Sequence, residues 1–357
     1  MICLNQITAG RPEKGIVQMQ CSRKSEPVRS CPLRRALGAL LICSALVCVA
    51  APAARAASGA LWIVDTDNGR VDEYLSSQLK SSHTPTPLTV SIGAVPDGAC
   101  FDKSNNLWVT DSAEEILGFT ASELKKLPTA PSPAVTISSS SFSNIVGCAF
   151  DKQGNLWLAD LANNSLDEIS AAQLKASGSI TPAVIITDSA EMSNARPGFV
   201  TFDKSGNLWT DGRNDEELFK FSASQLTSGG DKTAAVVLAG GGSLNDPGQI
   251  GFDGHGNLWV TSSYDNTVVK FPKGQLSTSN NDAPTVTISS SSLDGPWGLA
   301  FHGSDLWVMD YDDGNAQEFT PGHIKTTGSP APKVLLTGAA AIESWGIMFG
   351  PAFGKLP

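Results

Sequence analysis

The chain has 357 residues and a formal net charge of -10, from 25 basic and 35 acidic side chains. The first 56 residues contain eight of the basic residues and two of the acidic ones, so the remainder has a net charge of -16. A chain this acidic is not expected to bind nucleic acid or an anionic membrane surface. With 34 Gly, 21 Pro and 41% hydrophobic residues, the composition is typical of a turn-rich all-β protein.

Residues 1–56 are predicted to be a signal peptide. Two arginines precede an apolar run from Ala36 to Ala51, and a small-x-small cleavage site follows at Ala54 to Ala56. Met19 is an alternative start, because the stretch before it adds nothing that a signal needs. The apolar run is too short for a permanent anchor. We therefore expect a mature domain, residues 57–357, that is periplasmic or secreted and is not inserted in a membrane after cleavage.

A Leu-Trp repeat runs through the mature chain. Its six copies are spaced 46, 49, 52, 50 and 48 residues apart, which is the period of a propeller blade rather than of a helical solenoid. The repeated tryptophans are Trp62, Trp108, Trp157, Trp209, Trp259 and Trp307. The pattern predicts a six-bladed all-β propeller.

Each repeat is interpreted as four antiparallel strands, named a to d. Strand a is a short apolar stretch ending in Phe, strand b is the NLWV element, strand c alternates polar and apolar residues, and strand d is β-branched. Asp-x-x-Gly-Asn sequences predict a tight turn between a and b. Between c and d, capping boxes beginning at Thr120, Ser170 and Ser222 predict single helical turns, whose following Leu we expect to cover the outer edge of the blade.

The two ends of the mature chain complement each other. The N-terminal end begins at a strand b, and the C-terminal end stops after a lone strand a at Gly346 to Phe349. We expect the C-terminal strand a to join the N-terminal strands b to d, which completes six blades in a closed ring.

Repeats of the form Pro-x-Gly-x-x-Phe-Asp, Gly-Asn-Leu-Trp-Val-x-Asp and Asn-x-Val-x-x-Phe resemble NHL repeats over residues 58–357. Propellers of this appearance include partner-binding modules, metal-dependent lactonases resembling gluconolactonase and regucalcin, and streptogramin lyases. The repeated Trp and Phe are expected to fill the space between neighbouring blades. The resemblance also implies that ligands bind on the face formed by the b-c and d-a loops, around the central channel.

Residues just before or at the start of each strand a are therefore the candidate ligand-binding residues. The side chains at these positions are Asp97, Asn144, Arg196, Asp246, Asp294, Trp297, Glu343 and Trp345. We expect a small molecule, a saccharide or a protein as the partner, and a monomeric protein. The two tryptophans are placed to stack on a sugar or another flat ligand, or to pack across adjacent blades.

Three of these carboxylates, Asp97, Asp246 and Glu343, are candidate metal ligands. Acids grouped around a channel mouth repel one another unless a cation lies among them, and oxygen ligands of this type suit calcium or magnesium. Such a site would support a metal-dependent lactonase or esterase, the alternative to a binding protein. The competing interpretation is that these acids cap turns. Acids at the ends of strands b are interpreted in the same way, as turn-bonding residues, at Asp65, Asp111, Asp160 and Asp310.

The four histidines bear on the lyase alternative. His255 and His302 fall at a-b turns, and His83 and His323 fall in c-d loops, so all four are expected on the face opposite the ligand site. The lyase family uses a histidine as its acid or base, and this chain has no candidate for that role on the ligand-site face.

Two cysteines remain in the mature chain, Cys100 and Cys148. Cys100 is one residue before a repeated Phe and Cys148 is two residues before the next, so their side chains should leave their strands on opposite faces. The preferred interpretation is two buried small apolar residues; a disulfide is the alternative.

Overall fold

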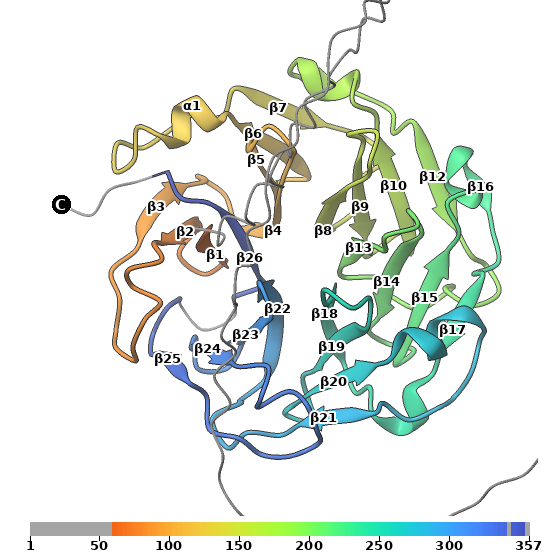
Figure 1. The fold of residues 1–357 in the computed structure, drawn as a ribbon. Helices are drawn as coiled ribbons and strands as arrows, with labels where there is room; N and C mark the ends of the chain where they lie inside the picture. The colour runs from red at the N-terminus through yellow and green to blue at the C-terminus, as the bar shows by residue number, and fades with distance from the viewer. Residues whose placement is uncertain (1–58, 341–343, 354–357) are drawn as a thin grey trace, which may run out of the picture. The chain divides into compact units, whose positions relative to one another are not determined.

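The computed structural model describes residues 59–340 and 344–353. These residues form six small antiparallel sheets arranged in a ring, which confirms the predicted six-bladed propeller (Figure 1). The predicted signal peptide lies outside the described residues. No helix within the described residues is both long and apolar enough to cross a membrane.

In each blade the first strand named is the one nearest the channel, and the others follow outward. Blade 1 is β26 (Gly346–Pro351), β1 (Gly59–Asp65), β2 (Arg70–Tyr74) and β3 (Leu88–Ser91). Blade 2 is β4 (Pro96–Phe101), β5 (Leu107–Asp111), β6 (Glu115–Phe119), β7 (Val135–Ser138) and β11 (Gly178–Ser179). Blade 3 is β8 (Ile145–Phe150), β9 (Leu156–Asp160), β10 (Ser165–Ile169), β12 (Val184–Thr187) and β16 (Gly230–Asp231).

The other three blades have four strands each. Blade 4 is β13 (Val200–Phe202), β14 (Leu208–Gly212), β15 (Glu217–Phe221) and β17 (Val236–Leu238). Blade 5 is β18 (Pro247–Phe252), β19 (Leu258–Ser262), β20 (Thr267–Phe271) and β21 (Val286–Ile288). Blade 6 is β22 (Pro296–His302), β23 (Asp305–Asp310), β24 (Ala316–Phe319) and β25 (Val334–Leu336).

Short helical turns occupy the c-d connections of four blades and one d-a connection. The capping box at Thr120 is present: its side chain accepts from the backbone of Glu123, and the Glu123 carboxylate accepts from the backbone of Thr120. The turns are α1 (Ala121–Leu124), η1 (Gln173–Lys175), η2 (Gln225–Thr227), η3 (Gly240–Gly242) and η4 (Lys273–Ser277).

The ring closes as predicted. Strand β26 pairs antiparallel with β1, with Trp62 opposite Met348 and Val64 opposite Gly346. The Trp62 indole also donates a hydrogen bond to the Pro351 carbonyl. The last strand of the chain is therefore the innermost strand of the first blade, and the ring needs no other closure.

Aromatic pairs join every blade to the next. The strand-b Trp of each blade meets the strand-a Phe of the following blade edge to face, with centroid distances from 5.3 to 6.5 Å. All six tryptophans are buried, so this repeated contact forms the core between blades, as the sequence predicted. The pairs are Trp62–Phe101, Trp108–Phe150, Trp157–Phe202, Trp209–Phe252, Trp259–Phe301 and Trp307–Phe349.

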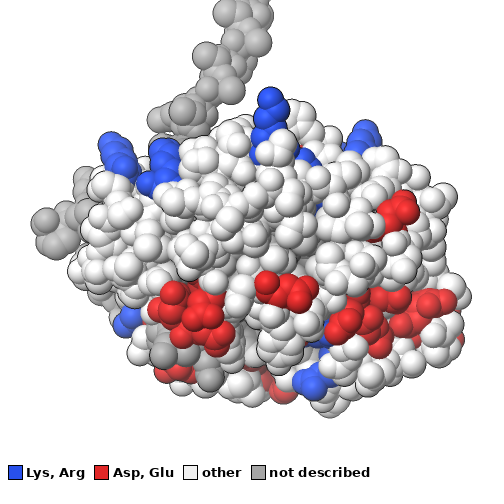
Figure 2. Space-filling view, turned by 90° about the horizontal axis from the view of Figure 1, so that it is seen from below, with Lys and Arg blue, Asp and Glu red and all other residues white. Residues whose placement is uncertain are grey.

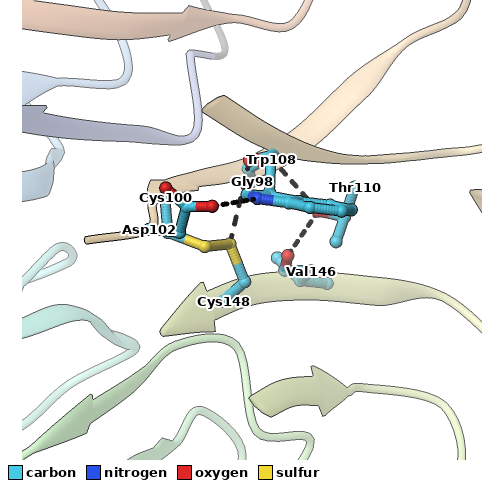
Figure 3. Close-up of a disulfide and its surroundings, with 7 residues drawn as sticks. All are labelled: Gly98, Cys100, Asp102, Trp108, Thr110, Val146 and Cys148. Atoms are coloured by element: carbon cyan, nitrogen blue, oxygen red, sulfur yellow. Dashed lines mark hydrogen bonds between the residues drawn. A yellow bond between two sulfur atoms is a disulfide. The ribbon is translucent and has the colours of Figure 1, made fainter. Parts of the chain in front are cut away.

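Cys100 and Cys148 form a disulfide between strands β4 and β8, so the preferred interpretation of two separate apolar residues was wrong (Figure 3). Their offset in the repeat is real: Cys100 lies opposite Trp108, but in the next blade Ala149 lies opposite Trp157. The two side chains therefore leave opposite faces of their own sheets. Because neighbouring blades pack face to face, opposite faces of adjacent sheets point at each other, and the offset brings the two sulfurs together.

Candidate binding site

The two faces of the ring differ in charge. Every described arginine lies on the face of the b-c and d-a loops, whereas the described lysines lie on the strands or on the a-b and c-d side. Figure 2 views the rim, with blue side chains gathered along its upper margin and most red ones along the lower part. Three lysines on the a-b turns donate to the neighbouring blade: Lys103 to Lys152 O, Lys152 to Lys204 O and Lys204 to Gly254 O. Acids such as Glu114, Asp246 and Asp312 lie in the b-c and d-a loops, so the predicted ligand face carries acids and no loop lysine among the described residues.

One side of the channel mouth on this face is hollowed into a pocket of about 300 Å³. Its walls come from blades 4, 5 and 6 and from the residue that precedes the closing strand. The lining residues are Arg213, Asp246, Ser263, Tyr264, Trp297, Tyr311, Asp312 and Trp345. Three of the predicted ligand residues, Asp246, Trp297 and Trp345, are brought together here.

Arg213 is at the centre of this pocket. Its guanidinium carbon lies 4.4 Å from the ring centroid of Trp297 and 5.4 Å from that of Trp345. Its Nε donates to Asp246 Oδ1 at 3.2 Å, and both side chains are mostly buried. No acceptor among the described residues takes a hydrogen bond from its two terminal amino groups. Stacking and the ion pair fix the guanidinium plane, and its outer edge remains available for a planar or bidentate acceptor.

Trp297 reaches across the mouth from the start of β22. Its ring contacts Phe199, Tyr311 and Trp345 with centroid distances of 5.9 to 6.3 Å. A Cβ on Gly248 would lie 3.3 Å from this indole and 2.7 Å from the Trp297 carbonyl, so the glycine of blade 5 makes room for it. Trp297 therefore packs across blades, the competing interpretation, while it also lines the pocket.

The indole N–H of Trp297 is buried and has no hydrogen-bond partner among the described residues. Burying such a donor without an acceptor costs about 1–3 kcal/mol, and buried polar groups in folded proteins are nearly always satisfied. An acceptor on a bound molecule would satisfy this donor. Together with the free edge of Arg213, the pocket offers donors beside two carboxylates, Asp246 and Asp312.

The sequence signal for Arg213 is a departure from the repeat. Blade 4 reads NLWTDG where blade 2 reads NLWVTD, so Asp211 lies two residues after the repeated Trp rather than three. Asp211 is fully buried and accepts hydrogen bonds from the backbone of Gly198 and Phe199. Burial raises its pKa to about 7, and the nearby Arg213 charge partly opposes this. Gly212 ends strand β14, and Arg213 follows it at the first turn position, four residues after the repeated Trp as in every other blade.

The same turn position explains the other aromatic residues that the sequence reasoning missed. The residue after strand b is Thr66, Ser112 and Leu161 in blades 1 to 3, but Arg213 and Tyr311 in blades 4 and 6. In blade 5 it is Ser263, followed by Tyr264. Tyr264 is 75% exposed and stands at the rim of the pocket. A comparison of this one position across the six repeats would have indicated the pocket.

A second hollow of about 290 Å³ adjoins the first and shares Arg213, Asp246 and Tyr264 with it. The predicted residue Arg196 lines this hollow rather than the aromatic pocket. Arg196 is exposed, and its backbone N–H donates to Asn164 Oδ1 at 2.8 Å. It is the second cation near the mouth, at the polar end of the joined cavity.

Asp97 and Asn144 line neither hollow. Asp97 is 8% exposed, and its burial, together with Asp111 and Glu114 nearby, raises its pKa to about 7. Asn144 has positive φ, and its backbone N–H donates to the Glu114 carboxylate at 2.7 Å. These two residues belong to the loops of blades 2 and 3 and do not contribute to either hollow.

Asp294 and Glu343 also fall outside the pocket lining. Asp294 is exposed, and its carbonyl accepts from the Asp312 backbone at 3.5 Å. Glu343 lies outside the described residues. Within residues 59–340 and 344–353, no three His, Cys, Asp or Glu side chains are grouped closely enough to hold a metal ion. The calcium or magnesium site at Asp97, Asp246 and Glu343 stays a prediction.

The acids at the ends of strands b do bond their turns. Asp111 accepts from the backbone of Ala113 and Glu115, at 3.0 and 3.1 Å, and Asp160 and Asp65 accept from the side chains of Asn163 and Asn68. Asp310 accepts from Gln317, while its other oxygen is buried without a partner among the described residues. Burial and the neighbouring Asp313 raise the pKa of Asp310 to about 9.

All four histidines lie on the face opposite the pocket, as predicted. His255 is in the a-b turn of blade 5 and His302 ends β22, while His83 and His323 belong to c-d connections. None of them lines the aromatic pocket.

Comparison with known proteins gives the fold alone. No family model and no curated protein matches the chain. Solved structures do match: a streptogramin B lyase (TM-score 0.55, 14% identity, 82% of this chain and 84% of that one) and a nidogen/laminin complex (0.58, 13%, 83% and 100%). A protein of unknown function from Bacteroides caccae is also similar (0.53, 10%, 82% and 99%). The resemblance to streptogramin-lyase-like propellers seen in the repeats is thus confirmed as a resemblance of fold.

Proposed function

We propose that this chain is an exported binding protein that takes a neutral saccharide into the aromatic pocket at the channel mouth. The observation that carries the proposal is the set of groups around Arg213. Two indoles and two phenols supply flat apolar surfaces, and the free guanidinium edge and the Trp297 N–H supply donors. Sugars present C–H faces for stacking and hydroxyls that both donate and accept, which such a pocket can match.

The charges favour a neutral ligand over a charged one. Asp246 already neutralises Arg213, and Asp312 and the other acids of this face repel an anion. The aromatic cage that would hold an organic cation is filled by the Arg213 guanidinium itself. Uncharged hydroxyls can bond to both the donors and the carboxylates without either penalty.

Export is part of the proposal. The Cys100–Cys148 disulfide supports it, because structural disulfides persist in oxidising compartments such as the periplasm and the extracellular space. The leader-like composition of residues 1–56 points the same way.

The test is a binding screen of neutral mono- and oligosaccharides by calorimetry and tryptophan fluorescence. The proposal expects at least one saccharide to bind and Arg213→Ala to weaken that binding by about ten- to a hundredfold, a loss of 1.4–2.8 kcal/mol. Lys103→Ala removes one positive charge from an exposed a-b turn on the opposite face, far from both hollows, and serves as the control. If every neutral saccharide fails to bind, or Arg213→Ala binds as well as Lys103→Ala, the proposal is wrong.

A further inference from the structure

The outer edges of the blades are covered by a repeated contact. In five of the six blades, the c-d segment of the next blade lies parallel to the outermost strand and hydrogen-bonds to it. In blades 2 and 3 this segment forms the fifth strands β11 and β16, and in blades 4, 5 and 6 it forms single bridges. The Leu or Ile after the helical turn was predicted to cover the blade edge. It packs in the same core cluster as the outermost strand of the neighbouring blade, and the residues after it hydrogen-bond to that strand.

The contact has the same chemistry in blades 2, 4, 5 and 6, best seen in blade 5, whereas blade 3 has Gly229 in place of the hydroxyl residue. The outward N–H of Thr287 donates to the Thr327 hydroxyl at 3.1 Å. The next residue, Gly328, donates its N–H to Thr287 O and accepts from the N–H of Ser289, both at 3.1 Å. A hydroxyl residue followed by a residue with a free backbone N–H thus satisfies three edge groups.

The same bonds recur around the ring. Ser279 and Asn280 bond Val237 and Ala239 in blade 4. Ser82 and His83 bond Leu335 and Thr337 in blade 6. The Ser177 hydroxyl accepts from Thr136 in blade 2. In each case the hydroxyl residue lies three positions after the Leu or Ile that follows the helical turn.

Blade 1 lacks this cover. The segment that would supply it comes from blade 2, and three and four positions after Leu124 it has Leu127 and Pro128. Leu127 has no hydroxyl and is buried in the core beneath β3, while Pro128 has no backbone N–H to donate. With Leu and Pro at these two positions, blade 2 lacks both the hydroxyl and the backbone N–H that form the contact in other blades.

The edge of β3 is consequently open among the described residues. Ile92 donates its N–H to Gly69 O on the β2 side, so alternation directs the backbone groups of Thr89 and Ser91 outward. These two residues are the equivalents of Thr287 and Ser289, and none of the three edge bonds is formed at them within residues 59–340 and 344–353. Ser91 is exposed and Thr89 is half-buried. An unpaired strand edge is a template for an added strand.

We propose that β3 binds an extended peptide segment of a partner protein by strand addition, parallel to β3, with a Ser or Thr at its centre followed by a residue that has a backbone N–H. The occupant is identified by the five complements within the molecule, which bond the equivalent edges in that orientation. Main-chain bonds supply the affinity in this mode, and the hydroxyl supplies the selectivity. This surface is on the rim of the ring and is separate from the aromatic pocket.

The probe is the peptide of residues 174–181, Leu-Lys-Ala-Ser-Gly-Ser-Ile-Thr, which contains the segment that bonds β7. The readout is amide hydrogen exchange of the full chain. Without peptide, the Thr89 and Ser91 amides should exchange at least tenfold faster than those of Thr287 and Ser289. Saturating peptide should slow them at least tenfold. The control peptide, with Ser-Gly replaced by the Leu-Pro of blade 2, should not.

Two variants complete the test. Pro128→Gly restores the missing N–H without touching buried Leu127, and Leu127→Ser/Pro128→Gly restores both groups. Both should slow exchange at Ser91 and weaken peptide binding, the double variant by at least tenfold. Equal protection at Thr89 and Thr287 in the free chain would show that the edge is already covered and overturn the proposal. The β3 amides could instead become more protected as the protein concentration rises, with dimers seen in sedimentation. The edge would then bind a second copy of this chain, and the proposal would also be overturned.

Discussion

Blades 1 to 3 and blades 4 to 6 are built from the same repeat, but they present different chemistry at the channel mouth. In blades 4 to 6 the turns after strand b carry Arg213, Tyr264 and Tyr311, which with Trp297 and Trp345 make a pocket. In blades 1 to 3 the same turns carry small or aliphatic residues. The mouth residue is the buried Asp97 in blade 2 and the exposed Asn144 in blade 3. Residues that obey the repeat build the ring, and residues that depart from it build the site.

The disulfide belongs to the half without the pocket, and its removal should have the largest effect. Cys100→Ser should lower the free energy of unfolding by up to about 4 kcal/mol, the loop-closure value for a 48-residue separation. Denaturant unfolding of the oxidised wild type and of the variant measures this. Saccharide binding should be unchanged at concentrations where both are folded. A variant as stable as the oxidised wild type would contradict the prediction.

Within the pocket, Arg213→Lys tests whether geometry or charge matters. A lysine keeps the charge but loses the planar fork and its stacking on two indoles. Calorimetry should show binding weakened by about tenfold, close to 1.4 kcal/mol. If lysine restores full affinity, Arg213 acts only as a charge, and the stacked geometry is unnecessary.

The buried carboxyls of the other half predict an acid-stabilised fold. The pKa of Asp97 is raised to about 7, so the folded state binds more protons than the unfolded state between about pH 4 and pH 7. The free energy of unfolding should therefore fall as pH rises through this range. In Asp97→Asn, the decrease in the free energy of unfolding over this pH range should be smaller than in the wild type by roughly 1–2 kcal/mol.

Chemical unfolding at pH 5 and pH 8, with both proteins, provides the measurement. Asp265 is an exposed acid of the same face, so Asp265→Asn serves as the control for the loss of one carboxylate. If Asp97→Asn loses as much stability between pH 5 and pH 8 as the wild type does, ionisation of Asp97 does not destabilise the fold.

Tyr264 should give the smallest effect. It is 75% exposed and touches the pocket only at its rim. Tyr264→Ala should weaken saccharide binding by about two- to fivefold, within 0.4–1 kcal/mol, with no change in unfolding. If Tyr264→Ala weakened saccharide binding as much as Arg213→Ala, the saccharide would bind at the rim and not around Arg213.

The fold could be predicted because its determinants are repeated. The spacing of the tryptophans indicated six blades, and the unmatched ends indicated the closure of β26 on β1. The disulfide was missed because the faces of one sheet were considered without the facing sheet of the next blade. Of the residues predicted to bind a ligand, Asp246, Trp297 and Trp345 line the aromatic pocket.

Arg213 was not predicted, because its surroundings are set by indoles about 80 and 130 residues away in sequence. The burial of Asp97 also could not be predicted from the sequence, because it depends on how neighbouring loops pack. Local patterns predict strands and turns, and they do not predict which loop residues meet over the channel.

Nitrogen-15 labelled protein offers the most direct test of the central claim, through the indole N–H signals of its eight tryptophans. Six of these indoles lie between blades, and two, Trp297 and Trp345, line the pocket. On titration with a binding saccharide, the signals of Trp297 and Trp345 should shift, and the other six should remain in place. Shifts confined to the six strand-b tryptophans, or no indole shift at saturation, would contradict the account.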